Sequence, residues 1–394
     1  MIRRVAFLSV HSSPLEAPGV GDAGGMNVYV DATARTLAAR GIVVDVFTRR
    51  LDPAVPDETA VVPGYCVIQV EASGEERADL IGSFAEGVVK WMAAHDATYD
   101  VIHSHYWLSG WAGLLLSELL DAPLAISFHT LGRVREATRA PGEPRESLVR
   151  IAAETEVVAR AGCVVASTPA DAADLLEHYR AAPERLCVSP PGVDHAVFAP
   201  GDRGAARRRL GLADGLLVAV VGRIQPLKGV NVAIRAVGTL PGVRLLVVGG
   251  PSGPDGEAEL GRLRQLAAAV APDRVEFRDA ISHGNVADVY RAADIVAVPS
   301  RSESFGLVAA EAQAVGTPVV AARVGGLAYT VVDGISGTLV SGDDPTDWAA
   351  AFAAILDDPL QAARLSTGAI AHAGDFSWEA TADRLLELYR GMVA

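Results

Sequence analysis

Lysine, cysteine and long apolar runs are all scarce in this 394-residue sequence, and each shortage excludes a class of protein. The three cysteines, Cys66, Cys163 and Cys187, form no CxxC pair and no zinc-site spacing, so we expect free thiols in a reducing cytoplasm. No segment approaches the roughly 20 apolar residues of a membrane-spanning helix, so we expect no membrane contact. A net charge of −14 argues against a nucleic-acid partner, because such proteins need a basic surface.

Only two lysines occur, Lys90 and Lys228, beside many arginines. Lys228 follows Arg223 by five positions in a loop that begins at Gly222, directly after the apolar, β-branched run 216–221. Such a run is typical of a parallel strand that is buried on both faces. Because ligands of open α/β sheets bind beyond the carboxyl ends of strands, the pattern predicts that the two cations hold a diphosphate. The alternative is that both are solvated cations on a surface loop.

Strand and helix patterns alternate through both halves of the chain. This alternation predicts right-handed βαβ units and an α/β fold with two Rossmann-like, doubly wound parallel sheets. We expect strands at 5–10, 42–48, 101–103, 124–128 and 163–167, and then at 216–221, 243–248, 275–277, 295–298, 318–321 and 337–340. A Pro/Gly-rich stretch near 190–201 predicts domains at 1–198 and 199–375, with an amphipathic C-terminal helix in 376–394 that packs back on the first domain. We expect the ligand in a central cleft that the two domains face.

A polar loop at 302–306 turns into a helix whose first backbone amides could bind an anion. Glu303 precedes this helix and could accept hydrogen bonds from sugar hydroxyls. Glu311 lies further along the helix and could bind both hydroxyls of a ribose. In the alternative, Glu303 caps the helix and Glu311 is a solvated helical residue. The preceding cationic loop at 222–228 favours a ligand site.

With these residues the chain resembles the retaining glycosyltransferases of family four, which have the GT-B fold. The resemblance rests on the Arg223/Lys228 pair and on a Glu-x7-Glu element that contains Ser304-Phe305-Gly306. Three longer strings, SVHSSPL at 9–15, GDAGGMNVY at 21–29 and HSHYWLSG at 103–110, are similar to the D-inositol-3-phosphate glycosyltransferases of mycothiol biosynthesis. The similarity implies metal-independent sugar transfer, with retention, from a UDP- or GDP-linked donor and without a cofactor. It also implies that 1–198 binds the acceptor and 199–375 the nucleotide sugar, and we expect a homodimer.

The resemblance further implies a role for each residue of the site. The leaving diphosphate would be neutralised during a front-face substitution, and the catalytic residues would be Arg223, Lys228, Glu303 and His129. The donor would contact Gly24, Gly25, Gly222, Ser304, Phe305, Gly306, Leu307, Val308 and Glu311. The acceptor would contact Asn27, Tyr106, Thr130 and Arg150. The structural alternatives are a tight turn at 24–25, a core histidine at 129, interface packing at 106, a turn at 130 and a surface cation at 150.

One stretch departs from the inositol-phosphate enzymes. Those enzymes carry a lysine for the acceptor phosphate in the loop before the helix that contains Phe84, whereas residues 71–77 here are acidic and lack lysine. Arg77 could replace it, but Glu75 and Glu76 would oppose an anionic acceptor. We therefore expect a small polar acceptor without a phosphate, in a natural-product (antibiotic) or low-molecular-weight-thiol pathway of an actinobacterium. The alternative is transfer from UDP-N-acetylglucosamine to inositol phosphate, as in mycothiol biosynthesis.

Two other function classes stay open at this point. A nucleotide-sugar epimerase would also bind a diphosphate and a ribose, but it would need no acceptor residues such as Tyr106, Thr130 and Arg150. A non-catalytic sugar-nucleotide sensor is disfavoured, because all four charged residues of the donor site are present. The string at 103–105 contains two histidines but no carboxylate or cysteine that would complete a metal site, so we expect no metal.

Overall fold

The structure is a computed structural model, and it describes residues 1–19, 21, 23–139, 145–253 and 255–393. The chain divides into two compact units. The first unit comprises Met1–Glu16, Gly25–Pro190 and Trp378–Ala394, and the second comprises Ala17–Gly24 and Pro191–Ser377. The short segment 17–24 thus belongs with the second unit, although it lies between elements of the first in the sequence; its residue Asp22, part of the string quoted above, is outside the described residues.

The first unit is built on an eight-stranded sheet with the order β3-β4-β2-β1-β5-β6-β7-β8. Neighbouring strands are parallel, except for the antiparallel β3–β4 pair at one edge. The order reverses between β1 and β5, which makes the carboxyl ends of these strands the switch point where ligands bind in such sheets. The strands are β1 (Arg4–Ser9), β2 (Val43–Arg49), β3 (Glu58–Val62), β4 (Tyr65–Val70), β5 (Val101–His105), β6 (Leu124–Ser127), β7 (Cys163–Ala166) and β8 (Leu186–Val188).

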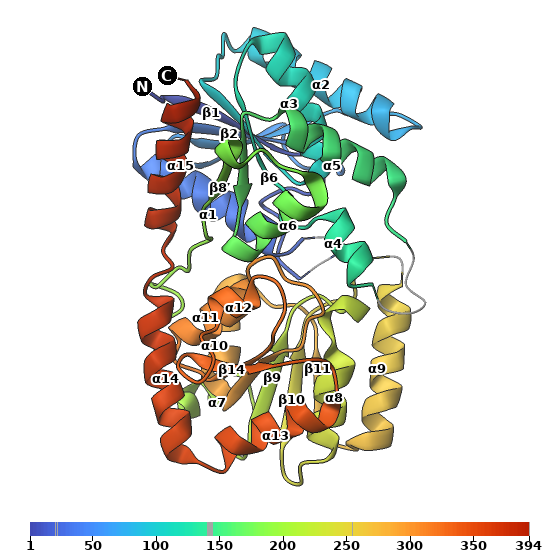
Figure 1. Cartoon of the computed structure of the whole chain (residues 1–394), viewed down its shortest axis with the longest axis vertical. Coiled ribbons are helices and arrows are strands. Elements are labelled where there is room, and N and C mark those ends of the chain that lie inside the picture. Colours follow the sequence, from blue (N-terminus) through green and yellow to red (C-terminus); the bar gives the residue numbers. More distant parts are fainter. Residues whose placement is uncertain (20, 22, 140–144, 254, 394) are drawn as a thin grey trace. The chain divides into compact units, whose positions relative to one another are not determined.

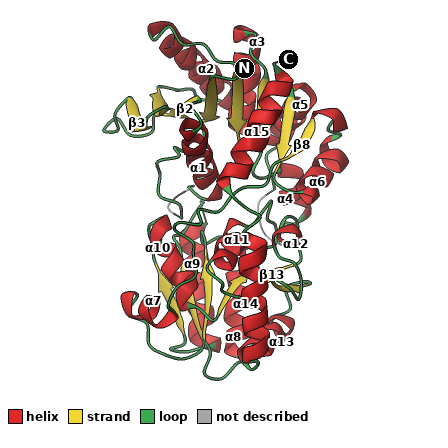
Figure 2. Ribbon diagram, turned by 90° about the vertical axis from the view of Figure 1, so that its left-hand side faces the viewer, coloured by secondary structure: helices red, strands yellow, loops and turns green. Residues whose placement is uncertain are grey.

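Helices cover both faces of this sheet (Figure 2). Because side chains alternate along a strand, Leu8 packs in the core that includes residues of α2, α3 and α5, whereas Phe7 packs in the core of α1 and α15. The helix α15 lies beside α1, so the last helix of the chain completes the first unit (Figure 1). The helices are α1 (Gly25–Ala39), α2 (Arg77–Ala94), α3 (Trp107–Leu120), α4 (Gly132–Ala137), α5 (Leu148–Arg160), α6 (Pro169–Tyr179) and α15 (Trp378–Met392).

The second unit contains a six-stranded parallel sheet with the order β11-β10-β9-β12-β13-β14. Its switch point lies between β9 and β12. The strands are β9 (Leu217–Val221), β10 (Arg244–Val248), β11 (Val275–Arg278), β12 (Ile295–Val298), β13 (Val319–Ala322) and β14 (Gly337–Val340), each within one residue of its predicted bounds. The helices are α7 (Arg203–Arg209), α8 (Val230–Gly238), α9 (Gly256–Val270), α10 (His283–Ala292), α11 (Leu307–Ala314), α12 (Leu327–Thr330), α13 (Pro345–Leu356) and α14 (Pro359–Ala373).

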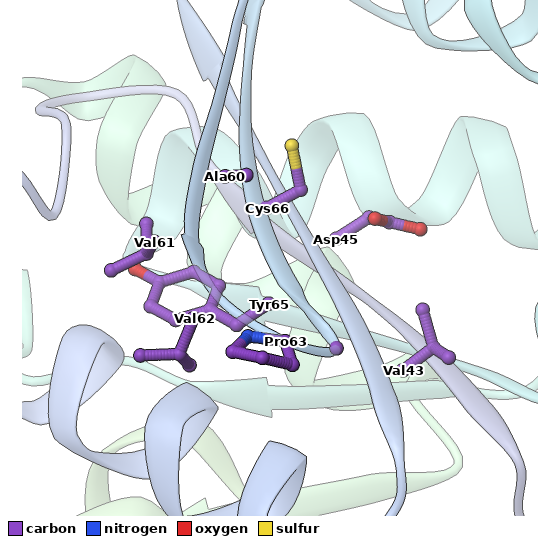
Figure 3. Close-up of a pocket in the computed structure, with 9 residues that line it drawn as sticks. Val43, Asp45, Ala60, Val61, Val62, Pro63, Tyr65 and Cys66 are labelled. Carbon is purple, nitrogen blue, oxygen red and sulfur yellow. The ribbon is translucent and has the colours of Figure 1, made fainter.

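A hollow between β2, β3 and β4 is lined mainly by apolar side chains (Figure 3). Its one charged lining residue, Asp45, is already bonded to Arg4 and to the Tyr99 hydroxyl. The one charged group that lines the hollow is therefore already paired. Across the described part of the chain, every helix is too short or too polar to cross a membrane.

Candidate functional site

The carboxyl ends of β9 and β12 bring the predicted lysine and glutamate together. Lys228 Nζ lies 2.5 Å from Glu303 Oε1, and the Ser300 hydroxyl donates to the same oxygen at 2.9 Å. Both charged side chains are only partly exposed, 25% for Lys228 and 18% for Glu303. The lysine is therefore held at the switch point of the second unit by a carboxylate that could also contact a ligand.

A glycine allows this approach of the two loops. Lys228 ends a short 3-10 turn, and Gly229 follows it with φ of 63° before α8 begins. A Cβ atom at Gly229 would lie 2.0 Å from the carbonyl oxygen of Pro299, which follows β12. No side chain larger than hydrogen fits there, so the glycine sets the distance between the lysine loop and the Glu303 loop.

The segment 17–24 lies against Arg223, the second predicted cation. A Cβ atom at Gly24 would lie 3.2 Å from Arg223 Nε, and the amide of Gly250 donates to the carbonyl of Gly19 at 3.2 Å. Gly222, directly before the arginine, has φ of 144° and follows β9. Helix α1 begins at Gly25, the residue after Gly24. Gly24 and Arg223, 199 positions apart, thus meet within the second unit.

Glu311 is buried in α11 and both of its oxygens are bonded. Its Oε1 lies 2.7 Å from His283 Nε2, and its Oε2 accepts from the Tyr290 hydroxyl at 3.0 Å. Burial and the nearby carboxylate raise the pKa of Tyr290 well above its usual value, so this hydroxyl stays a donor. The alternative of a solvated Glu311 is wrong, since only 4% of the residue is exposed.

The start of α11 differs from the structural alternative in a second respect. Gly306, with φ of 93°, is the N-cap of the helix, and Glu303 lies three residues before it. Phe305 is buried and packs edge-on against Phe376 at 5.2 Å, so its side chain serves the core. Ser304 precedes this N-cap, and Leu307 and Val308 are the first two residues of the helix; their contact with the donor stays a prediction.

In the first unit, two strands are followed by strained backbone, one at the predicted acceptor residue Tyr106 and one at the predicted catalytic residue His129. Tyr106 follows β5 with φ of 75°, and His129 lies beyond β6 with φ of 60°. The Tyr106 amide donates to the carbonyl of Ser127 at 2.9 Å, and its ring lies 4.9 Å from that of His11, which follows β1. Positive φ in bulky residues concentrates at functional sites, because the surrounding structure must hold it.

Arg150 joins the other two predicted acceptor residues. Its Nη2 donates to the Thr130 carbonyl at 3.0 Å and to the Thr130 hydroxyl at 3.1 Å, and its guanidinium lies 5.1 Å from the Tyr106 ring centre. Arg150 is 3% exposed, so the alternative of a surface cation is wrong. Asn27, in contrast, is buried in α1, where its amide donates to Ser12 and Ser13.

Two carboxylates bind Arg150 and were not predicted from the sequence. Arg150 Nε donates to Glu154 at 2.7 Å, and Nη1 donates to Glu146 at 3.2 Å. Glu154 is fully buried and also accepts from the Gly132 amide and the Tyr179 hydroxyl. Burial opposes the arginine's charge, yet its neighbours raise the pKa of Arg150. The i,i+4 spacing of residues 146, 150 and 154, of which the last two lie on α5, was the available signal.

Among the residues that the structure describes, no group of three or more His, Cys, Asp or Glu side chains could hold a metal ion. His103 and His105 do lie close together, but their neighbours are aromatic residues and serines. Burial lowers the pKa of His129 to about 3, so this imidazole is neutral at physiological pH.

Comparison with known proteins explains this arrangement. A model described as "Glycosyltransferase Family 4" matches residues 23–197, and one described as "Glycosyl transferases group 1" matches 202–372. A D-inositol 3-phosphate glycosyltransferase of Mycobacterium marinum is 49% identical over 99% of this chain and 86% of its own length. The chain belongs to glycosyltransferase family four. The enzyme of the same name from Thermobispora bispora is 48% identical over 98% of this chain and 94% of its own length.

Solved structures agree with this family. A sucrose-phosphate synthase from Thermosynechococcus elongatus superimposes with a TM-score of 0.92 at 34% identity, covering 99% of this chain and 98% of the other. HepE of Anabaena, in complex with UDP and glucose, superimposes with a TM-score of 0.81 at 21% identity, covering 99% and 100%, which shows the fold alone. The predicted GT-B fold and glycosyltransferase activity are confirmed, and the epimerase and sensor alternatives lose their support.

Proposed function

We propose that this glycosyltransferase moves a sugar from a nucleotide-diphosphate sugar to D-inositol 3-phosphate, with retention of the anomeric configuration. The acceptor is supported by 48–49% identity, over nearly the whole chain, to several enzymes of that name. We thus place the phosphorylated acceptor first, whereas the sequence alone favoured an acceptor without a phosphate. The donor sugar to test first is N-acetylglucosamine linked to UDP, which the resemblance to the mycothiol enzymes implies.

The observation that supports this reaction is the Lys228–Glu303 pair at the switch point of the second unit. Lys228 lies in the same loop as Arg223. As the bond between sugar and diphosphate breaks, negative charge develops on the leaving oxygen, and both cations would stabilise it. Glu303 holds the lysine in place and has a second oxygen for a sugar hydroxyl. The front-face substitution needs no carboxylate behind the anomeric carbon, and residues 124–132 contain none.

The carboxylate of Glu311 would accept hydrogen bonds from a ribose. A carboxylate has about four acceptor positions, and His283 and Tyr290 occupy two of them. The remaining positions suit the two adjacent hydroxyls of a ribose. Because its carboxylate is held from two sides, Glu311 loses little side-chain freedom when the nucleotide binds.

The acceptor phosphate would lie at Tyr106, Thr130 and Arg150. The Thr130 hydroxyl accepts from Arg150 and can donate its own hydrogen to a phosphate oxygen. Arg77 supplies a further cation, since its guanidinium lies 5.2 Å from the ring centre of Trp107, the residue next to Tyr106. Arg77 would thus take the place of the lysine that the sequence lacks.

One observation favours the second candidate, an acceptor without a phosphate. Arg150 is bonded to both Glu146 and Glu154, and Glu146 also pairs with Arg135, so this cluster of two arginines and two glutamates carries no net positive charge. A phosphate dianion would find no net attraction there unless Arg77 supplies it. A neutral or zwitterionic acceptor, such as a small thiol with a betaine group, would not need this compensation.

The deciding experiment compares D-inositol 3-phosphate, free inositol and ergothioneine as acceptors of UDP-N-acetylglucosamine. We expect transfer to the phosphorylated acceptor with an α-linkage in the NMR spectrum of the product. Arg77→Ala should raise its KM by at least about tenfold, because one charged hydrogen-bond donor is lost. Arg35→Ala is the matched control, since Arg35 pairs with Asp31 on α1. Transfer to an unphosphorylated acceptor alone would replace the proposal by the second candidate, and a β-linkage would exclude retention.

We further propose that the enzyme works in the cytoplasm, a location supported by its free cysteines. The homodimer stays a prediction, and light scattering of the purified protein would test it.

A further inference from the structure

Behind His129, the first unit contains a row of buried polar side chains that the proposed reaction does not use. His129 Nε2 lies 3.2 Å from Nδ1 of His105, and the His105 ring packs against that of His103 at 4.4 Å. His103 in turn is bonded on both nitrogens, to the Tyr389 hydroxyl at 2.5 Å and to the Ser127 hydroxyl at 3.0 Å. The row therefore runs from the strand ends to a tyrosine of α15.

A second set of contacts joins α15 to the imidazole of His129. The Tyr29 ring meets that of His129 edge-on at 5.1 Å, with an interplanar angle of 68°. Trp378, the first residue of α15, meets Tyr29 edge-on at 5.8 Å. Both ends of one helix thus reach His129, each through intermediate aromatic rings. The helix α15 directly follows Ser377, the last residue of the second unit.

The protonation state of the row follows from its burial. Desolvation lowers the pKa of His103 to about 3 and that of His105 well below its usual value, and His129 behaves likewise. All three imidazoles are therefore neutral near pH 7, with one proton each. His105 Nε2 has no hydrogen-bond partner among the described residues.

This unpartnered nitrogen indicates which tautomer is present. A buried N–H without an acceptor is less well tolerated than a bare lone pair, so the proton of His105 belongs on Nδ1. That N–H then donates to His129 Nε2, which leaves the His129 proton on Nδ1. The row consequently selects one of the two neutral forms of His129 and one orientation of its ring.

Buried polar groups cost free energy unless they are bonded, and apolar side chains would fill this space without that cost. His103, His105 and Tyr389 are all fully buried. The neighbouring backbone at His129 is also held at φ of 60°, away from its preferred regions. Such an arrangement is suited to fixing one residue rather than to general stability.

We propose that α15 positions the His129 imidazole, with Tyr389 acting through His103 and His105 and Trp378 acting through Tyr29. This inference rests on the proposed function and on the catalytic role that the family resemblance implies for His129. Tyr389 and Trp378 are positioning residues that touch no substrate. Loss of the Tyr389 hydroxyl would free His103 to rotate, and the misplacement would reach His129 through the packed rings.

The test uses the full-length enzyme with Tyr389→Phe, which removes one hydroxyl and keeps the ring. With UDP-N-acetylglucosamine and D-inositol 3-phosphate, kcat should fall about tenfold while both KM values stay within about twofold, because orientation affects the reacting geometry more than binding. Tyr99→Phe is the matched control. It also removes the hydroxyl bond of a partly buried tyrosine, to Asp45, but Tyr99 precedes β5 and lies outside the row. Trp378→Phe should retain most of the activity that Trp378→Ala loses.

A second measurement is independent of activity. In protein labelled with ¹⁵N at histidine, long-range NMR correlations distinguish the two neutral tautomers of each imidazole. The wild type should show His129 protonated at Nδ1, and Tyr389→Phe should shift the ring nitrogens of both His103 and His129. Tyr99→Phe should shift neither. Should either Tyr389→Phe or Trp378→Ala fail to fold, the other variant carries the same comparison.

The outcomes separate the two proposals. Unchanged kcat together with unchanged His129 nitrogen shifts in Tyr389→Phe would overturn the positioning role. Shifted nitrogens with unchanged kcat would also overturn it, because His129 would then be coupled to α15 without consequence for turnover. If His129→Ala itself keeps full turnover, the catalytic assignment of His129 fails, whatever the NMR shifts show.

Discussion

The two units present their polar residues at equivalent strand ends, yet they hold them in different ways. In the second unit, Lys228 and Glu303 form one partly exposed pair that can exchange partners with a ligand. In the first unit, Arg150 and Glu154 are buried and bonded in a closed network. Under the proposed assignment of donor and acceptor residues, the donor site uses accessible charge, whereas the acceptor site uses side chains that are fixed before the ligand arrives.

The largest expected effect is on stability and falls on the first unit. Glu154→Ala should lower the free energy of unfolding by about 3 kcal/mol or more, because it leaves buried Arg150 with a single carboxylate and removes the acceptor of the Gly132 amide. Urea denaturation measures the change. Glu156→Ala, which removes an exposed partner of Arg160, is the control and should cost less than about 1 kcal/mol. Equal costs would contradict the difference drawn between buried and exposed pairs.

The second effect is on turnover and falls on the second unit. Lys228→Ala or Arg223→Ala should lower kcat by about two orders of magnitude, since each removes about 3 kcal/mol of stabilisation from the leaving diphosphate. Unfolding free energies should change little, because both residues lie in the loop after β9. Lys90→Ala provides the control, as Lys90 is 80% exposed on α2. Near-normal turnover in either variant would show that this loop does not form the donor site.

The third effect is a dependence of stability on pH, and it arises in the first unit. His103, His105 and His129 have lowered pKa values in the folded protein, so they stay neutral while the unfolded chain takes up protons below about pH 6.5. Stability is therefore retained above pH 6.5 and lost as the pH falls, by about 1.4 kcal/mol per pH unit for each imidazole. Asp171 has the opposite effect on stability, because burial raises its pKa to about 6 and the folded protein therefore binds this proton more readily than the unfolded chain.

Urea denaturation at pH 7.5 and 5.5 checks the sign and the size of this dependence. His129→Asn should reduce the loss, because it removes one of the three imidazoles that are buried in the neutral form. A protein that is equally stable at both pH values would show that the imidazoles are not buried in the neutral form.

The smallest effect concerns Glu311. Tyr290→Phe removes one of its two bonds, and the donor KM should rise about fivefold, corresponding to about 1 kcal/mol, with kcat nearly unchanged. Tyr329→Phe is a suitable control, because Tyr329 is an exposed tyrosine of the same unit. A fall in kcat without a change in KM would mean that Glu311 acts on the reacting sugar and not on the ribose.

Much of the fold could be predicted from local patterns. Apart from the edge strand β11, the strands of the second unit are short, mostly buried apolar runs, and the ends of all six were placed to within one residue. The strand β3 carries no strong apolar signal, because all of its residues are intermediate or exposed, whereas β4 is a largely buried apolar run that was not predicted. Likewise, the assignment of 17–24 to the second unit has no signature in its own sequence.

The sequence by itself determined the sheets, the lysine loop and the family, because each is encoded in contiguous residues whose spacing reflects strand and loop geometry. Only the tertiary structure decided what surrounds Glu311, Arg150 and His129. His283 lies 28 positions from Glu311, and Tyr389 lies 286 positions from His103. Contacts of this kind depend on the order of strands in a sheet and on the return of the last helix. A polar residue on a helix has no local signal that distinguishes a buried partner from water.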